Sequence, residues 1–212
     1  MLSRLLVAGA LLLPSLPAFA LDAYMWGVGP QIGTIVIPGH YPIRFPKTVD
    51  RNDTLSEVRD DLSLGGEAVY YVDGHTRTLA MANMGFGRGY LDYHLILKYN
   101  YVTQTGAMDF LAGGGLGVGQ ARWRGDGDSV LKSPYYPARV EGSALIRDNT
   151  RAYQLTFYGQ YNLPAQQRFW NADGVEVNDI GGGVYALFGT ELTVLFGDFT
   201  PPKNMRKATG GA

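Results

Sequence analysis

The stretch from Leu91 to Tyr101 constrains this chain more than any other, because it alternates between an apolar and a largely polar face. One face carries Leu91, Tyr93, Leu95, Leu97, Tyr99 and Tyr101, and the other carries Asp92, His94, Ile96, Lys98 and Asn100. Successive side chains of a β-strand point to opposite sides, so the alternation predicts a strand with one apolar face. That face either covers a protein core or, in a closed barrel, meets lipid while the charges line the lumen.

The first 20 residues are predicted to be a secretory signal peptide outside the fold. Arg4 supplies a positive charge, residues 5–13 are apolar, and Ala18-Phe19-Ala20 forms a small-x-small cleavage site. No later apolar run reaches the ~18 residues of a spanning helix. Only a closed barrel could then cross a membrane with every backbone group paired.

The composition favours such a barrel in the outer membrane of a Gram-negative bacterium. Charged residues make up 17% of the chain, below the ~25% of soluble domains. Glycine is abundant at 29 residues, and tyrosine outnumbers phenylalanine by 14 to 9. The absence of cysteine excludes disulfides and a lipid-anchored cysteine. The balanced charge, 18 basic against 19 acidic residues, gives no basic footprint for nucleic acid.

Eight segments show the two-residue period of strands. They are residues 23–36, 62–72, 76–87, 91–101, 108–123, 138–147, 151–162 and 184–199. Tight turns are predicted at Asp73-Gly74 and Asp148-Asn149. Long links are predicted over 37–61, 124–137 and 163–183, and the link around Gly87-Arg88-Gly89 is short. The pattern predicts an all-β fold, an eight-stranded antiparallel up-and-down transmembrane β-barrel with long extracellular loops and short periplasmic turns.

Two local alternatives remain open in the long links. Phe169-Trp170 and the segment 175–177 flank Asp173-Gly174, which permits an extra hairpin and a ten-stranded barrel. The preferred interpretation is an extension of the seventh and eighth strands beyond the membrane. In the first long link, Asp53 or Thr54 is a candidate cap for a short helix that carries Leu55, Val58 and Leu62.

Over essentially the whole mature chain, this architecture resembles the small eight-stranded outer-membrane barrels of the OmpA/OmpX-like superfamily. The resemblance implies a barrel over residues 21–199, a periplasmic tail over 200–212, and recognition by the barrel-assembly machinery through Phe196 or Phe199. It also implies contact with membrane lipid and lipopolysaccharide. Girdles of aromatic side chains are expected at both membrane surfaces. The girdle candidates are Trp26, Tyr93, Tyr99, Tyr101, Trp123, Tyr153 and Tyr161.

The lumen is predicted to hold a network of charged side chains. Its members are Glu67, Arg77, Asp92, His94, Lys98, Arg139, Glu141, Arg147 and Glu191. An eight-stranded barrel is just wide enough for side chains to fill, so these charges must pair with one another. We expect a salt-bridged plug, and the alternative is a gated ion path. The four glycines Gly113, Gly115, Gly117 and Gly119 match no phosphate-binding template and are expected to make room for neighbouring side chains.

Few features of the sequence support catalysis or metal binding. The chain has three histidines and no Gly-x-Ser-x-Gly elbow. Only His40 is placed where lipid could reach it, with Ser56, Ser129 or Ser133 as imaginable loop partners. No histidines lie at metal-ligand spacing. We therefore expect no enzyme activity, cofactor or metal.

The loops carry the remaining functional candidates. Proline and aromatic residues cluster at 38–46 and 134–137, and the docking candidates are His40, Tyr41, Phe45, Tyr135 and Tyr136. Such loops either dock a partner or pack over the barrel mouth. The predicted function is a non-enzymatic outer-membrane barrel with a structural or docking role, such as part of an envelope assembly for motility, secretion or adhesion. A narrow channel or small-solute porin is the alternative, and a lipid A-modifying enzyme is a distant third.

Overall fold

The barrel is built from eight long strands. A computed structural model describes residues 25–37, 59–73, 75–87, 90–104, 108–124, 130–165, 168–170, 174–177 and 185–200. The long strands are β1 (Trp26–Ile37), β2 (Arg59–Tyr71), β3 (Thr76–Gly87), β4 (Tyr90–Gln104), β5 (Asp109–Arg124), β6 (Val130–Arg147), β7 (Arg151–Pro164) and β10 (Tyr185–Asp198). The predicted signal peptide, the segment after Thr200 and most of the predicted loop helix lie outside the described residues.

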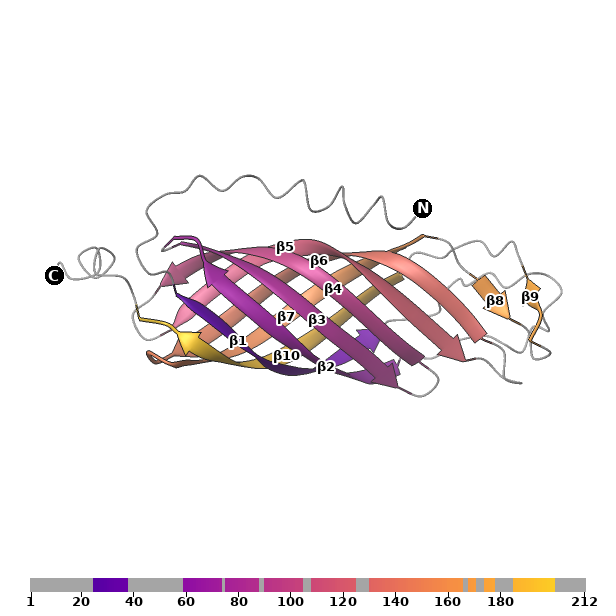
Figure 1. The fold of residues 1–212 in the computed structure, drawn as a ribbon, viewed down its shortest axis with the longest axis horizontal. Helices are drawn as coiled ribbons and strands as arrows, with labels where there is room; N and C mark the ends of the chain where they lie inside the picture. The colour runs from indigo at the N-terminus through magenta and orange to yellow at the C-terminus, as the bar shows by residue number, and fades with distance from the viewer. Residues whose placement is uncertain are drawn as a thin grey trace.

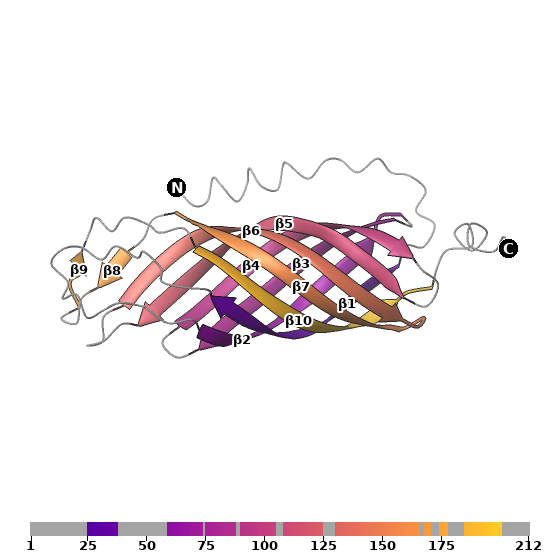
Figure 2. The ribbon, with the colours of Figure 1, turned by 180° about the vertical axis from the view of Figure 1, so that it is seen from behind.

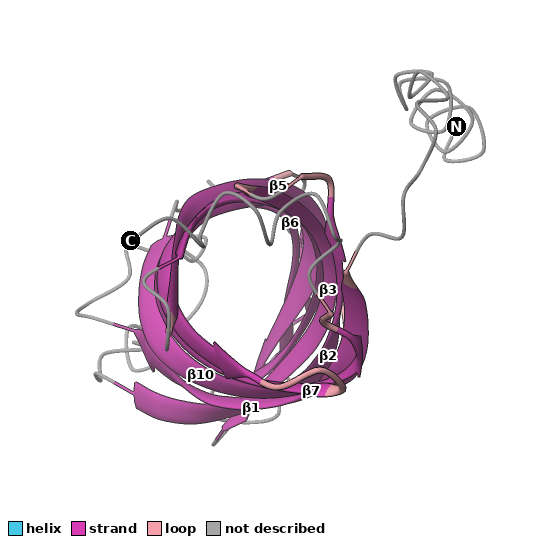
Figure 3. Cartoon of the chain, turned by 90° about the vertical axis from the view of Figure 1, so that its left-hand side faces the viewer, coloured by secondary structure: helices cyan, strands magenta, loops and turns pink. Residues whose placement is uncertain are grey.

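Antiparallel pairing closes these strands on themselves, as the end-on view in Figure 3 shows. Each long strand pairs with its neighbours in the chain, β7 pairs with β10, and β10 pairs with β1 to complete the ring. Closure leaves no free sheet edge around the barrel wall, which is what a β-structure in lipid requires. The eight-stranded barrel that the sequence predicts is confirmed. No helix among the described residues is long and apolar enough to cross a membrane.

The alternation of side chains turns the apolar faces outward. Leu97, Leu116 and Val140 on adjoining strands are 63%, 71% and 69% exposed. Their charged neighbours along the chain, such as Lys98 and Arg139, are buried inside. Two outward polar residues, Thr34 on β1 and Thr190 on β10, face each other across the closing seam and share a hydrogen bond of 3.0 Å. An apolar exterior around a charged interior is the arrangement of a barrel embedded in lipid.

Strand β6 begins earlier than predicted, at Val130 instead of residue 138. Pro134 and Pro137 indicate a loop in the sequence because proline lacks the N–H that a strand needs. The ladder between β5 and β6 is interrupted at Pro137, with pairs at Leu116↔Ala138 and Gly119↔Tyr135 but none between, whereas Pro134 still lies opposite Gln120. The predicted loop over 124–137 is therefore wrong over most of its length.

The segment after β7 forms a separate small hairpin. Strand β8 (Arg168–Trp170) pairs with β9 (Glu176–Val177) and also with Val130–Lys132 at the start of β6. This differs from the predicted extension of the seventh and eighth strands, because the hairpin joins the wall at β6. In Figure 1 it stands beyond one end of the barrel, at the right of the view. Figure 2 shows the same arrangement from behind.

Tight turns close the end at which the described chain begins and ends. In the turn from β6 to β7, the Asp148 carboxylate accepts hydrogen bonds from the backbone N–H groups of Thr150 and Arg151, both at 2.7 Å. These bonds lower the pKa of Asp148, the Thr150 bond most and the Arg151 bond next. In the turn from β2 to β3, Asp73 accepts a bond of 2.7 Å from the N–H of His75. We call this the turn end of the barrel.

Candidate functional site

A chain of ion pairs runs through the middle of the lumen, and its side chains come from five strands. Lys98 Nζ donates to Glu67 Oε2 at 2.8 Å and to Glu141 Oε2 at 3.1 Å. At one end, Arg77 Nη2 lies 3.9 Å from Glu67 Oε1. We call the following six side chains, taken in this order, the ion-pair chain: Arg77, Glu67, Lys98, Glu141, Arg139 and Glu191. Three cations alternate with three carboxylates, so the charges balance.

Arg139 occupies the most connected position in the ion-pair chain. Its Nε donates to Glu141 Oε2 at 2.8 Å, and both of its terminal nitrogens donate to the Glu191 carboxylate. The guanidinium also lies over the ring of Tyr158, 3.7 Å from its centroid. A bidentate pair with a stacked aromatic ring fixes the orientation of the guanidinium as well as its charge.

Neutral amides complete the coordination of these charges. Asn83 Nδ2 donates to Glu191 at 3.2 Å, and Asn100 Nδ2 donates to Glu141 at 2.8 Å. Gln154 Oε1 accepts from Arg77 at 2.6 Å. The side chains of the ion pairs are fully buried. A buried charge is tolerated only when it is paired and hydrogen-bonded, so each member depends on its partners.

A second polar cluster lies nearer the hairpin end of the barrel. Asp92 accepts a hydrogen bond from the Tyr135 hydroxyl through one oxygen, and its other oxygen lies 3.2 Å from His94 Nδ1. The Tyr135 hydroxyl also lies 3.2 Å from the same nitrogen. His94 Nε2 is buried and has no hydrogen-bond partner among the described residues. The Asp–His pair is thus linked to a tyrosine.

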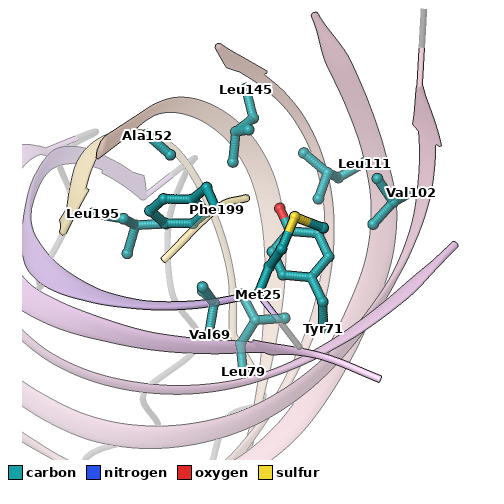
Figure 4. Close-up of a cluster of buried hydrophobic side chains, with 10 residues drawn as sticks. All are labelled: Met25, Val69, Tyr71, Leu79, Val102, Leu111, Leu145, Ala152, Leu195 and Phe199. Atoms are coloured by element: carbon teal, nitrogen blue, oxygen red, sulfur yellow. The ribbon is translucent and has the colours of Figure 1, made fainter. Parts of the chain in front are cut away.

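At the turn end, the lumen changes from polar to apolar. Ten buried side chains meet there, as Figure 4 shows. They are Met25, Val69, Tyr71, Leu79, Val102, Leu111, Leu145, Ala152, Leu195 and Phe199. Seven of the eight long strands contribute, and Met25 directly precedes the eighth, β1. We call this set the apolar cluster. Its members come from all around the wall, and each is at most 4% exposed, so little solvent reaches the lumen at this level.

Arg147 binds the residues that flank the first and last strands of the barrel, beside this cluster. Its Nη1 donates to the Phe199 carbonyl oxygen at 2.9 Å and lies 3.1 Å from Met25 Sδ. Its Nε donates to Asp109 Oδ2 at 2.7 Å. One guanidinium therefore holds residues just before β1 and just after β10 against the barrel floor.

The glycines of β5 provide space beneath long side chains of β4. A Cβ at Gly115 would lie 2.8 Å from Lys98 Cγ, and one at Gly117 would lie 2.9 Å from Ile96 Cγ1. A Cβ at Gly119 would meet the ring of Tyr135. The steric role predicted for this face agrees with these approaches.

The structure separates the predicted lumen residues into three places. Six of them form the ion-pair chain, Asp92 and His94 join Tyr135, and Arg147 lies at the turn end. The apolar cluster and the ion pair of Asp109 with Arg147 were not predicted from the sequence. The alternation in β5 puts Asp109 on the inward face with the glycines, so the sequence pattern could have predicted Asp109 as a lumen residue.

Other predicted site residues fall outside the lumen network. Six girdle candidates point outward and are about half exposed, namely Trp26, Tyr93, Tyr99, Tyr101, Tyr153 and Tyr161. Trp123 lies in β5, and its side chain is outside the described part, as are His40, Tyr41, Phe45, Ser56 and Ser129. The loop assignment of Tyr135 and Tyr136 is wrong, because both lie in β6, Tyr135 buried and Tyr136 exposed. Ser133 is likewise buried in β6.

Comparison with known proteins identifies the class through the fold. No family model matches the sequence, and no curated protein matches it by sequence. The structure is similar to Neisserial surface protein A, with a TM-score of 0.56 and 10% identity over 82% of this chain and 97% of that one. It is also similar to the outer membrane protein OprG from Pseudomonas aeruginosa, with a TM-score of 0.50 and 11% identity over 84% of this chain and 96% of that one.

At these identities the likeness establishes the fold. The chain is an eight-stranded β-barrel of the outer-membrane type, which confirms the fold class and the resemblance that the sequence indicated. The predicted location, the outer membrane of a Gram-negative bacterium, agrees with both neighbours and with the apolar exterior.

Proposed function

We propose that this protein is a non-enzymatic outer-membrane barrel with a closed lumen, and that it serves a structural or partner-docking role in the envelope. The observation that supports this is the apolar cluster below the ion-pair chain. An ion that crossed the barrel would first have to break fully buried ion pairs and then pass ten apolar side chains without water. Transfer of a charge into such surroundings is strongly unfavourable.

The docking role is supported by the wall of the barrel, which extends further on the side of β6 than elsewhere. Strand β6 has 18 residues, more than any other, and its first three residues also pair with β8. The β8–β9 hairpin therefore extends the wall on the side of the barrel where β6 lies (Figure 1). A projection built from strands is a suitable surface for an envelope protein partner.

A narrow channel is the second candidate, and one observation favours it. Several buried lumen atoms have no hydrogen-bond partner among the described residues, including the side-chain amide of Gln31 and the hydroxyls of Ser63 and Thr193. Buried polar groups of this kind are commonly satisfied by water. A lumen that holds water above the apolar cluster would conduct if the cluster opened.

Single-channel recording on the refolded full chain distinguishes the two functions. We expect no steady conductance from the native barrel. Replacing Met25 and Phe199 by serine in a barrel that also carries R139Q and E191Q should create a conducting state, because this removes the bidentate ion pair and the two cluster side chains that precede β1 and follow β10. Phe196→Ser is the matched control, since Phe196 faces outward and is 49% exposed. Steady conductance by the native protein would contradict the closed-lumen proposal.

Photo-crosslinking in native membranes tests docking. A photoreactive residue at Val175, which is 58% exposed beside β9, should give discrete protein adducts. The same residue at Leu116, which points outward from the middle of β5, should give none beyond lipid. Equal labelling at both positions would argue against a partner at the hairpin.

A further inference from the structure

Two strands bring a carboxylate, an imidazole and a phenol together inside the lumen. Asp92 and His94 lie two positions apart on the inward face of β4, and Tyr135 reaches them from β6. His94 stands opposite Gly119 on β5, and Gly119 stands opposite Tyr135. A Cβ at Gly119 would meet the ring of Tyr135, so the glycine lets this ring cross β5 toward β4. We call Asp92, His94 and Tyr135 the Asp–His–Tyr cluster.

The donor atoms of this cluster have the spacing of ligands around a metal ion. His94 Nδ1 lies 3.2 Å from Asp92 Oδ2 and 3.2 Å from the Tyr135 hydroxyl oxygen. Both distances are at the upper end of the range for N–H···O hydrogen bonds. Ligand atoms that bind a transition-metal ion at roughly 2.1 Å lie about 3.0–3.4 Å from one another in octahedral and tetrahedral sites. The Tyr135 hydroxyl also bonds the second Asp92 oxygen, so the three groups face one another.

The charge of Asp92 lacks a permanent cation. Each carboxylate of the ion-pair chain contacts an arginine or a lysine. The Asp92 side chain is fully buried, and its basic partner among the described residues is His94, whose charge depends on protonation. A buried carboxylate needs a compensating positive charge. A bound cation would supply that charge and leave His94 neutral, which is the form in which imidazole binds metals.

The far side of the imidazole leaves Nδ1 available for coordination. His94 Nε2 is buried and has no hydrogen-bond partner among the described residues, so no hydrogen bond there fixes the tautomer. With the hydrogen on Nε2, the Nδ1 lone pair faces two oxygens and is stabilised only by a cation between them. No group of three histidine, cysteine or acidic side chains that could hold a metal occurs in the described part of the chain, and the third donor here is a phenol.

The order of inward residues along β4 places the cluster at the hairpin end of the lumen. Asp92 and His94 come first, followed by Lys98 of the ion-pair chain and then by Val102 of the apolar cluster. An ion that enters from the hairpin end therefore reaches the Asp–His–Tyr cluster before it meets the ion-pair chain.

We propose that the Asp–His–Tyr cluster binds one divalent transition-metal ion, of the kind that suits one imidazole and two oxygen donors, such as Cu²⁺ or Zn²⁺. Binding releases to solvent the hydroxyl proton of Tyr135 and the proton between His94 and Asp92. The two positive charges of the ion are then balanced by the Asp92 carboxylate and the Tyr135 phenolate. This departs from the expectation of no metal, because Tyr135 joins the pair only through the register of β4, β5 and β6.

Titration of the untagged, refolded full chain with Cu²⁺ in neutral detergent tests this proposal. We expect one bound ion per barrel, an electron paramagnetic resonance spectrum with hyperfine splitting from one imidazole nitrogen, and a visible phenolate-to-copper charge-transfer band. Excess Zn²⁺ should displace the Cu²⁺. Ca²⁺ should not displace it, because Ca²⁺ prefers six to eight oxygen ligands.

Three variants and one control assign the ligands. Tyr135→Phe keeps the ring, so it should abolish the charge-transfer band and weaken binding at least about tenfold, the lower limit for the loss of even an outer-shell partner. His94→Gln should remove the nitrogen splitting. Gly119→Ala displaces the Tyr135 ring and should weaken the band. The matched control H40Q/H75Q removes the other two histidines and should keep both signals. Heat-dependent electrophoretic mobility shows that each variant is folded.

Four outcomes would overturn the proposal. A native barrel that binds neither Cu²⁺ nor Zn²⁺ would favour a protonated His94 as the cation beside Asp92. An unchanged affinity and spectrum in Tyr135→Phe would show that the phenol is not a ligand. Loss of binding in the control would place the ion on His40 or His75. Equal displacement by Ca²⁺ would indicate a nonspecific acidic site. Conductance and crosslinking enter none of these readouts, so the proposed function is tested separately.

Discussion

The ion-pair chain and the apolar cluster occupy neighbouring levels of one lumen and are held together by different physics. Each charged side chain in the ion-pair chain depends on a particular partner, as Arg139 does on Glu191. The side chains of the apolar cluster need only fill the space, and residues as different as Met25 and Phe199 share it. The ion-pair chain therefore specifies which strands meet, whereas the apolar cluster closes the lumen at the turn end.

The largest expected effect is the loss of one charge from the ion-pair chain. Glu191→Leu leaves the Arg139 guanidinium without its bidentate partner, and we expect the free energy of unfolding to fall by about 3–5 kcal/mol. Urea titration of the barrel in lipid vesicles, followed by tryptophan fluorescence, measures this change. The double variant R139M/E191L should recover more than half of the loss, because Glu141 keeps Lys98 and Asn100. If the double variant were as unstable as the single one, the loss would not come from an unpaired Arg139. The ion-pair chain would then not differ from the apolar cluster in its dependence on particular partners.

A cavity in the apolar cluster should cost less. Leu145 is fully buried there, and Leu145→Ala should lower the free energy of unfolding by about 3 kcal/mol. Leu145→Met preserves the volume and should cost less than about 1.5 kcal/mol. The same urea titration applies. A larger penalty for methionine than for alanine would show that shape, and not volume, governs this level.

Added bulk beneath the ion-pair chain should have a smaller effect. A Cβ at Gly115 would clash with the Leu97 carbonyl oxygen and lie 2.8 Å from Lys98 Cγ, so Gly115→Ala should cost about 1–3 kcal/mol. Gly142→Ala is the matched control, because its nearest atom would be 3.9 Å away. The control should be neutral or slightly stabilising. Equal destabilisation by both variants would mean that backbone freedom, and not room for Lys98, explains the glycines of β5.

The smallest expected effect concerns the turn that joins the strands of Leu145 and Ala152. Hydrogen bonds from Thr150 and then Arg151 hold the pKa of Asp148 below its ordinary value of 3.8. The carboxylate therefore stabilises the fold above pH 3.8, and this contribution fades as the pH falls through the lower folded pKa. Asp148→Ala should be less stable than the native protein at pH 6 and should approach it near pH 2. A difference that did not depend on pH would assign the effect to the turn geometry alone.

Much of the barrel could be predicted from the sequence, because lipid and lumen impose opposite polarity on alternate residues. The faces of Leu91–Tyr101 are those observed in β4. The inward position of the charges follows from the same alternation. The pairing of particular charges depends on the register of all the strands around the closed ring. Lys98, for example, pairs with Glu67 and Glu141 on other strands. A single strand does not encode that register.

Three features escaped prediction for identifiable physical reasons. The apolar cluster was hidden because inward residues such as Leu111 and Leu145 are as apolar as lipid-facing ones, so alternation carries no signal at the turn end. The start of β6 was hidden by Pro134 and Pro137, which the ladder accommodates. The pairing of β8 with β6 joins segments more than 30 residues apart, and no local pattern reports it.

The hydrogen bond between Thr34 and Thr190 favours the correct register where β1 and β10 close the barrel. Thr34 and Thr190 bond to each other only in the observed register of β1 with β10. A slip of two residues, the smallest that keeps the apolar face outward, would place Thr34 opposite Phe188 or Leu192. Two hydroxyls would then face hydrocarbon without a partner, each at a cost of a few kcal/mol. A barrel closed in the wrong register is therefore less stable in lipid than the correctly closed one, so the membrane favours the correct register of β1 with β10.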